Sequence, residues 1–323
     1  MVRGMFLQIN SREKAKHVSK SLELAILLEA SANKPGNVNR TTGFENTRYE
    51  DFLASAVAIS SSFEYAAERG VLVSCGEIHV SDVGLGRIIR DCVANVNAWQ
   101  RGGNTLLGTA ILLSPIAIAA GMTPAKEDVF EIPKLRENMK LVVESTTPED
   151  AVNVYEAIKS ANPGGLGKVP ELDINDPNSK KRILEERISL FQIFQISSKY
   201  DTVCSEWVNN YPITFDVAYP SLTEQIRKTD NLNKAIVHTF LKVLAEYPDT
   251  LIARKTSREK ALEVSFKAKE ILKLGGLETL SGREKLREFD RELRKAGNLL
   301  NPGTTADIIA AALALNVLGG YKP

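Results

Sequence analysis

Apolar residues recur at helical spacing along nearly the whole chain, as Leu22, Ala25 and Ile26 do near its start. A period of about 3.6 residues is typical of helices with one buried face. This pattern predicts helices at residues 12–31, 49–69, 81–100, 105–120, 134–145, 148–161, 180–195, 198–210, 221–246, 256–273, 282–296 and 304–318. Strand-like alternation is confined to residues 71–73 and 77–80, where it predicts a hairpin at most. We therefore expect an all-α fold, in which residues 1–323 form a single large multi-helix bundle with long functional loops.

Turn-forming and capping residues predict where several helices begin and end. Thr147 precedes Pro148 and should cap a helix, and Ser281 should cap another after a helix that ends at Gly275 and Gly276. The long predicted helix at 221–246 should break near Asp230.

The loop at residues 162–179 is rich in Gly, Pro, Asn and Asp. Ordered loops of this length are often functional, and the alternative is a flexible linker between two halves. Its stretch "GGLGK" at residues 164–168 lacks the first glycine of a P-loop and has Val169 where Ser or Thr is required. We keep it only as a cover for a ligand.

Charge and composition narrow the functional classes. Lys and Arg total 41 against 40 Asp and Glu, which argues against a nucleic-acid binder that relies on a strong positive field. The three cysteines are far apart, which favours reduced thiols in the cytoplasm. The three histidines lack the spacing of a zinc site, and no catalytic triad is apparent. The most apolar segment, 106–122, contains Pro115 and predicts a buried helix instead of a membrane span.

The stretch "EASANKPGNVNR", residues 29–40, ends the first predicted helix with a carboxylate on its apolar face. A buried carboxylate is costly unless it is paired or binds a metal. Glu29 is therefore either a core salt-bridge partner of Lys34 or Arg40, or a catalytic base or magnesium ligand. In the second case Lys34 would reach a phosphate, and Gly36 would let the backbone approach it.

Two further stretches have glycine turns that lead into helices of small and apolar residues. In "GGNTLLGTAILLSP", Asn104 or Thr105 begins a helix whose free N–H groups would attract an anion; otherwise Asn104 is a simple cap. In "NPGTTADIIAAALAL", Asn301, Gly303 and Thr304 would suit a polyphosphate. There the alternative is a capping box formed by Thr304 and Asp307.

A fourth stretch, residues 198–216, places Asp201 and Ser205 on one helical face. Asp201 is either a metal-ligating carboxylate or a polar residue near a helix start.

Together, "LLEASANKPGNVNR", "GGNTLLGTAILLSP" and "NPGTTADIIAAALAL", in this order, resemble the ATP:dephospho-CoA triphosphoribosyl transferase family, also called triphosphoribosyl-dephospho-CoA synthase. "DFLASAVAIS" and "YDTVCSEWVNNYP" also look like family blocks. The resemblance implies an all-helical enzyme that uses ATP and Mg²⁺. A ribose hydroxyl of dephospho-CoA attacks the anomeric carbon of the ATP ribose, and adenine leaves with the triphosphate retained on the product.

The resemblance and the chemistry of such a transfer together select candidate residues. An oxocarbenium-like state and an acceptor hydroxyl need carboxylates, and a triphosphate needs a divalent cation, basic groups and helix N–H groups. The catalytic candidates are Glu29, Asp51 and Asp201. The phosphate-binding candidates are Lys34, Gly36, Asn37, Arg40, Asn104, Thr105, Asn301, Gly303 and Thr304. The Mg²⁺ ligands would be Asp201 and Asp307. We expect Lys34, Asn104 and Asp307 to converge on one cleft.

One departure from the family pattern concerns the acceptor. Relatives that make the prosthetic-group precursor have His and a basic residue where this chain has Leu106 and Leu107. The chain resembles a divergent branch of the kind found in archaea, and we predict ATP binding with little or no transfer to dephospho-CoA. The sequence does not identify the acceptor or the oligomeric state, and a homodimer is one possibility. The alternatives are a Mg²⁺-dependent nucleotide hydrolase and a non-catalytic nucleotide-binding helical protein. We expect it in the cytoplasm, with no nucleic-acid or membrane partner.

Overall fold

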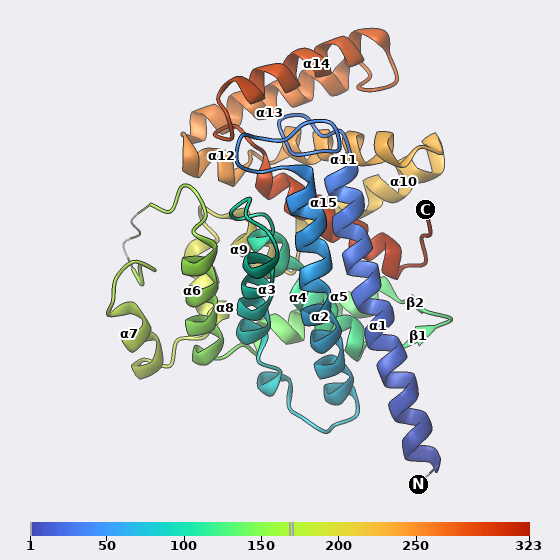
Figure 1. The fold of residues 1–323 in the computed structure, drawn as a ribbon, viewed down its shortest axis with the longest axis vertical. Coiled ribbons are helices and arrows are strands. Elements are labelled where there is room, and N and C mark those ends of the chain that lie inside the picture. Colours follow the sequence, from blue (N-terminus) through green and yellow to red (C-terminus); the bar gives the residue numbers. More distant parts are fainter. Residues whose placement is uncertain (1, 168, 170) are drawn as a thin grey trace.

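The computed structural model describes residues 2–167, 169 and 171–323 and is almost wholly helical (Figure 1). The helices are α1 (Val2–Ser31), α2 (Tyr49–Ser74), α3 (Leu85–Trp99), α4 (Leu107–Met122), α5 (Ile132–Glu144), α6 (Pro148–Ala161), α7 (Ser179–Glu185), α8 (Leu190–Ser197), α9 (Thr202–Val208), α10 (Tyr219–Thr229), α11 (Leu232–Glu246), α12 (Thr250–Lys255), α13 (Arg258–Lys273), α14 (Leu280–Lys295) and α15 (Gly303–Leu318). A 3₁₀ turn (Val80–Asp82), a π-helical turn (Ile213–Ala218) and a hairpin of β1 (Ala125–Lys126) and β2 (Val129–Phe130) complete the described elements. The all-α prediction is confirmed.

Two helices of small and apolar residues, α4 and α15, lie at the centre of the core. Both are buried around nearly their whole circumference, as expected of helices without a polar face. Helix α1 packs against α2 and against both helices of this pair, and α2 packs against α4 (Figure 1). The apolar segment 106–122 is thus a buried helix, and no helix of the described chain is long and apolar enough to cross a membrane.

Helices α2 and α4 approach closely because each has a glycine at their contact. A Cβ atom at Gly70 would lie 2.0 Å from the carbonyl oxygen of Ile118, and one at Gly121 would lie 2.2 Å from that of Ala67. Any side chain at either position would push the helices apart. The close contact fixes where the N-terminus of α4 points, and that N-terminus forms part of the cavity described below.

Some predicted boundaries are confirmed. Thr147 caps α6 and accepts a hydrogen bond from the N–H of Asp150, and α13 is followed by Gly275 and Gly276 with φ of +90° and +55°. The break near Asp230 is a left-handed residue between α10 and α11, with φ of +46°. Residues 162–178 contain no helix within the described part of this loop.

Other predictions of local structure are wrong. The strand expected at 71–73 is the last turn of α2, and the hairpin lies instead between Ala125 and Phe130. The helix expected at 180–195 divides into α7 and α8, separated by Arg187 with φ of +54°. Thr279, not Ser281, caps α14, because its hydroxyl accepts from the N–H of Gly282. The π-helical turn and α12 have no counterpart among the predicted elements.

Candidate functional site

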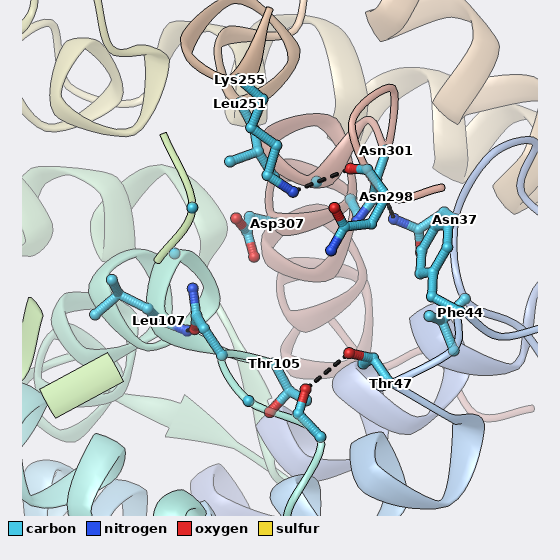
Figure 2. A pocket seen from close by; sticks show the side chains of 18 of the residues that line it. Asn37, Phe44, Thr47, Thr105, Leu107, Leu251, Lys255, Asn298, Asn301 and Asp307 are labelled. Atoms are coloured by element: carbon cyan, nitrogen blue, oxygen red, sulfur yellow. Dashed lines mark hydrogen bonds between the residues drawn. The ribbon is translucent and has the colours of Figure 1, made fainter. Parts of the chain in front are cut away.

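A cavity of about 490 Å³ lies where the N-termini of α4 and α15 meet the C-terminus of α1 and the end of α12. Figure 2 shows Asp307 facing the cavity, with Lys255 on one side of it and Thr47 and Thr105 on the other. Polar residues from widely separated segments line the wall: Glu29, Asn37, Asn46, Thr47, Asn104, Thr105, Thr109, Asn162, Arg254, Lys255, Asn298, Asn301 and Asp307. Two carboxylates and two cations therefore share a space of the size that holds a small-molecule ligand.

The N-terminus of α4 forms one wall and begins two residues later than predicted. Asn104 Oδ1 accepts a hydrogen bond of 3.1 Å from the N–H of Leu107, the first helical residue. The Thr105 hydroxyl lies 2.7 Å from that of Ser55 on α2. Asn104 thus acts as a cap and also lines the cavity, so the two interpretations of this residue are compatible.

Asp307 connects the two central helices across the cavity. Its Oδ1 accepts a hydrogen bond of 2.5 Å from the Thr109 hydroxyl on α4. A Cβ atom at position 108 would lie 2.0 Å from Asp307 Oδ2, so Gly108 makes room for this carboxylate. The pKa of Asp307 is raised to about 8, mainly by burial. The hydrogen bond from Thr109 opposes this shift, and the carboxylates of Glu29 and Asp249 contribute to it.

The predicted capping box of Thr304 and Asp307 is wrong, because another carboxylate caps α15. Asp249 Oδ2 accepts hydrogen bonds of 2.8 Å from both the N–H and the hydroxyl of Thr305. Asp249 also caps α12 through the N–H groups of Leu251 and Ile252. Thr304 is buried, with its hydroxyl 3.3 Å from that of Thr250. Gly303 lines the cavity and Thr304 does not.

Glu29 and Lys34 form a buried ion pair, with Glu29 Oε1 3.1 Å from Lys34 Nζ. The contact is poorly aligned for a hydrogen bond, and Oε1 accepts none from the described residues. Lys34 Nζ instead donates to the carbonyl oxygens of Glu29, Ala32 and Val38. Burial raises the pKa of Glu29 and lowers that of Lys34, and the attraction between the two opposes both shifts.

Of the predicted phosphate ligands on residues 34–40, only Asn37 lines the cavity. Lys34 has no solvent exposure and is absent from the cavity wall. The Gly36 N–H is bonded to Asp290 Oδ1 at 2.8 Å, and Arg40 is exposed elsewhere on the surface. The expected convergence of Lys34, Asn104 and Asp307 is therefore met by the last two, while Lys34 reaches the site only through Glu29.

Two other candidate carboxylates lie outside the cavity wall. Asp51 Oδ2 accepts from the N–H of Arg48 at the start of α2. Asp201 caps α9 through the N–H groups of Val203 and Cys204, and its Oδ2 is 2.6 Å from Nη1 of Arg254. Asp201 is thus a polar residue at a helix start, the second of the two interpretations, and it positions Arg254, which lines the cavity.

Arg254 and Lys255, the two cations that the described residues contribute to the cavity wall, were not identified from the sequence. They occupy the last turn of α12, where basic residues ordinarily complement the helix dipole, so their pattern indicated nothing unusual. Lys255 Nζ donates to the carbonyl oxygen of Asn298 at 3.0 Å. Burial lowers the pKa of Lys255, with Asp249 acting in the opposite direction. A further lysine, Lys168 of the loop predicted to cover the ligand, is outside the described residues.

The donor set is compatible with a divalent cation bound together with a ligand. Glu29 and Asp307 line the same cavity, and no group of three or more potential metal ligands occurs among the described residues. Mg²⁺ commonly takes one or two carboxylates and completes its shell with water and phosphate oxygens. A cation here would also relieve the repulsion between the carboxylates that raises the pKa of Asp307.

The fold and the cavity thus define an all-helical protein that encloses a small-molecule site of mixed charge. The family model for ATP:dephospho-CoA triphosphoribosyl transferase matches residues 15–323. The chain belongs to this family of transferases.

Individual relatives agree with the family assignment. A Malonomonas rubra protein described as "Probable 2-(5''-triphosphoribosyl)-3'-dephosphocoenzyme-A synthase" is 24% identical over 314 residues, covering 94% of this chain and 88% of the relative. The Klebsiella pneumoniae 2-(5''-triphosphoribosyl)-3'-dephosphocoenzyme-A synthase is 31% identical over 99 residues, 31% of this chain and 32% of the relative. A crystal structure from Archaeoglobus fulgidus, described provisionally as a triphosphoribosyl-dephospho-CoA synthase, has a TM-score of 0.61 at 20% identity and covers 84% of this chain and 100% of its own. That last likeness concerns the fold.

Proposed function

We propose that this enzyme transfers the triphosphoribosyl group of ATP to a hydroxyl of a nucleotide or CoA-type acceptor and releases adenine. The observation that supports it best is the placement of Glu29 and Asp307 with Arg254 and Lys255 around one cavity, in a chain of this family. Carboxylates suit a ribose centre that becomes positive, and cations suit a triphosphate.

In the proposed reaction a bond forms between the acceptor oxygen and the anomeric carbon, while the bond from that carbon to adenine breaks. The electron pair of the broken bond stays with adenine, which takes up a proton. Glu29 accepts the hydroxyl proton, since its Oε1 has no well-aligned hydrogen bond from the described residues. The developing charge on the ribose lies close to the carboxylates of Glu29 and Asp307.

The triphosphate would be held by Arg254, Lys255 and the N–H groups at the start of α4, with Asn104 and Thr105 beside them. Asn37, Asn301 and Gly303 form the adjoining wall and orient the ligand. Mg²⁺, bound by Asp307 with Glu29 near it, would neutralise phosphate charge. Lys34, Asp51 and Asp201 serve by positioning other groups, because each is engaged in contacts outside the cavity wall. The cytoplasm supplies ATP and keeps the free cysteines reduced.

Leu107 bears on the choice of acceptor. It is buried in the first turn of α4 and is one of the residues that line the cavity, and a longer, basic side chain at this position would contact an anionic group there. Leu106 packs into the hydrophobic core beside it. We therefore expect an acceptor with less negative charge at this point than dephospho-CoA carries, and slow transfer to dephospho-CoA itself.

The test is to incubate the purified protein with ATP and Mg²⁺, with and without acceptors that include dephospho-CoA, and to measure adenine and products by mass spectrometry. Adenine that appears only with an acceptor supports transfer. Adenine or phosphate released with water alone indicates a hydrolase, and the absence of both contradicts catalysis. Efficient formation of triphosphoribosyl-dephospho-CoA would contradict the role given to Leu107. Asp307→Asn serves as the inactive control.

A further inference from the structure

A second hollow lies on the opposite face of the loop that follows α1. Residues 33–42 of this loop form one side of a groove of about 500 Å³, which we call the outer groove. Helix α14 forms the other side, and α11 contributes Val237 to it. The groove and the catalytic cavity have no lining residue in common, since Asn37 lines only the cavity and Asn39 only the groove. The outer groove is therefore a separate candidate site.

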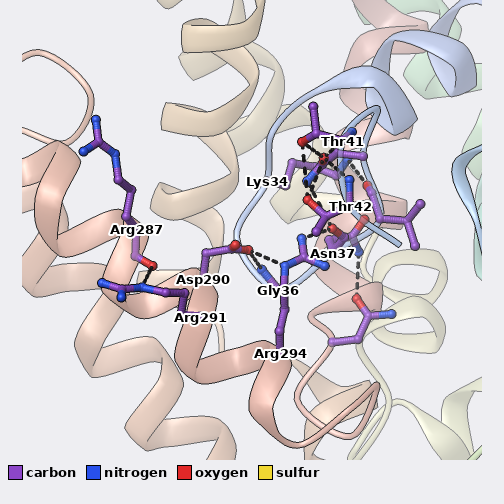
Figure 3. A network of polar contacts seen from close by, with 12 residues as sticks. Lys34, Gly36, Asn37, Thr41, Thr42, Arg287, Asp290, Arg291 and Arg294 are labelled. Atoms are coloured by element: carbon purple, nitrogen blue, oxygen red, sulfur yellow. Dashed lines mark hydrogen bonds and ion pairs between the residues drawn. The ribbon is translucent and has the colours of Figure 1, made fainter. Parts of the chain in front are cut away.

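Three arginines on α14 line the outer groove. Arg283, Arg287 and Arg291 are four residues apart, so they share one face of the helix. Figure 3 shows Arg287 and Arg291 extending from the helix, whereas Asp290 and Arg294 turn toward the loop. Like charges at this spacing repel each other, and a bound anion would relieve that repulsion.

None of these three arginines forms an ion pair with a carboxylate of the described residues. Arg283 Nη1 donates to the carbonyl oxygens of Leu277 and Glu278, and Arg291 Nε donates to that of Arg287. These bonds engage backbone oxygens and leave the charges of the guanidinium groups uncompensated. Other cations of α13 and α14 do have such a partner: Lys285 pairs with Glu288, and Lys267 pairs with Glu292.

The one carboxylate among the lining residues is already engaged. Asp290 Oδ1 accepts from the N–H of Gly36 at 2.8 Å and from Nε of Arg294 at 2.9 Å. Arg294 is turned inward to the loop, where its Nη2 donates to the carbonyl oxygen of Asn37. Asp290 is thus neutralised on the loop side, and the groove keeps a net positive charge.

The rest of the groove is ordered and partly apolar. Asn39 Oδ1 accepts hydrogen bonds from the N–H and hydroxyl groups of both Thr41 and Thr42, which fixes the loop at the groove edge. Val237 and Leu286 are buried beneath it. Arginines beside an apolar floor suit a molecule with phosphate groups at one end and an apolar or planar part at the other.

We propose that the outer groove is a second binding site for a phosphate-bearing small molecule of the nucleotide class, held by Arg283, Arg287 and Arg291. The volume, about that of the catalytic cavity, is sufficient for such a ligand. The proposal does not rest on the transferase reaction, because no residue of the outer groove lines the catalytic cavity.

The test is to measure the stoichiometry of ADP binding by calorimetry at about 0.15 M salt, where weak surface attraction is screened. We expect two equivalents for the wild type. The double variant Arg287→Gln/Arg291→Gln should weaken one of them at least about tenfold, as expected for the loss of charge-assisted bonds, and keep the other. Lys255→Gln should instead weaken the equivalent bound in the catalytic cavity and keep the one bound in the outer groove. Both arginines are exposed, so the variant should fold, and Lys295→Gln on the same helix, outside the groove, should retain both equivalents.

A single equivalent in the wild type, unaffected by Arg287→Gln/Arg291→Gln, would overturn the proposal. Pyrophosphate, which has no apolar part, tests the role of the apolar floor. Weaker binding of pyrophosphate than of ADP at the outer groove supports a contribution of this floor to binding, and equal binding overturns that contribution. Adenine release with an acceptor should be unchanged in the arginine variant at saturating ATP. Failure of the second site and failure of the transferase reaction are therefore distinguishable.

Discussion

The loop after α1 and the short helix α12 each bring a lysine to the neighbourhood of the same cavity, with opposite results. Lys34 is enclosed by its own loop, where it bonds three carbonyl oxygens and pairs with Glu29. Lys255 lines the cavity wall and has one hydrogen bond with the described part of the chain, to the carbonyl oxygen of Asn298. The first lysine belongs to a stretch that the sequence singled out, and the second does not.

The two lysines show that a residue near a site can either hold the local backbone in place or contact the ligand. The last carbonyl groups of a helix have no partner within it, and Lys34 donates to that of Glu29 in the last turn of α1 and to that of Ala32 directly after the helix. It thereby fixes the direction of the loop that carries Asn37 to the cavity. Among the described residues, the cations that line the cavity come from α12, which Asp249 and Asp201 hold in place. A motif can therefore identify a family through residues that build the site without touching the ligand.

The largest expected effect comes from Lys34→Met, which should destabilise the protein by about 3–5 kcal/mol because it leaves Glu29 buried without its partner. Chemical denaturation of the ligand-free protein measures this loss. The double variant Glu29→Gln/Lys34→Met removes both charges and should recover part of it. A Lys34→Met protein of normal stability with weakened ATP binding would reverse the comparison, since Lys34 would then be a ligand residue.

Lys255→Gln should raise the Kd for Mg²⁺–ATP by about ten- to a hundredfold, in line with about 1.5–3 kcal/mol for a hydrogen bond to a charged group. Its melting temperature should change little, because the side chain makes one hydrogen bond with the described residues. Equilibrium binding and a thermal melt check both parts, with Lys295→Gln as the surface control. Unchanged ATP affinity would show that Lys255 of α12 does not bind the phosphate groups.

A pH scan addresses Asp307, whose pKa is raised to about 8. Below that pH the carboxyl is mostly protonated and must lose its proton to bind Mg²⁺, so Mg²⁺-dependent ATP affinity should rise with pH, by at most about tenfold per unit, and level off above 8. In Asp307→Asn this part of the pH dependence should be absent, so that ATP affinity changes with pH only through the titration of ATP itself. The same slope in both proteins would show that Asp307 does not hold the metal.

The smallest effect is expected for Asp201→Ala. Loss of its cap on α9 should cost about 1 kcal/mol, and the loss should be equal with and without Mg²⁺. ATP affinity should fall slightly as Arg254 loses its partner. Thermal melts in the presence of Mg²⁺ or a chelator make the comparison. A loss of affinity seen only with Mg²⁺ would restore Asp201 as a metal ligand.

Helical periodicity is a local property, and it predicted the all-α class and most of the helices correctly. It failed where the chain departs from regular geometry over one or two residues, as at Arg187, and where a helix is as short as α12. The polar turns before α4 and α15 could be identified because glycine and asparagine directly before a run of small and apolar residues are typical of a helix start. Asp249 was missed because its partner Thr305 is 56 residues away, and no local pattern records such a contact.

The hydrogen bond between Asn37 and Asn301 joins positions 264 residues apart, and that between Thr109 and Asp307 joins positions 198 apart. Contacts over such separations require closure of very long loops, which delays their formation in folding. During synthesis the first helices can therefore pack well before the cavity exists. Only when α15 leaves the ribosome and docks does the chain acquire its two facing walls. Mutations that slow this docking should lower the yield of active enzyme without altering the activity of the molecules that complete it.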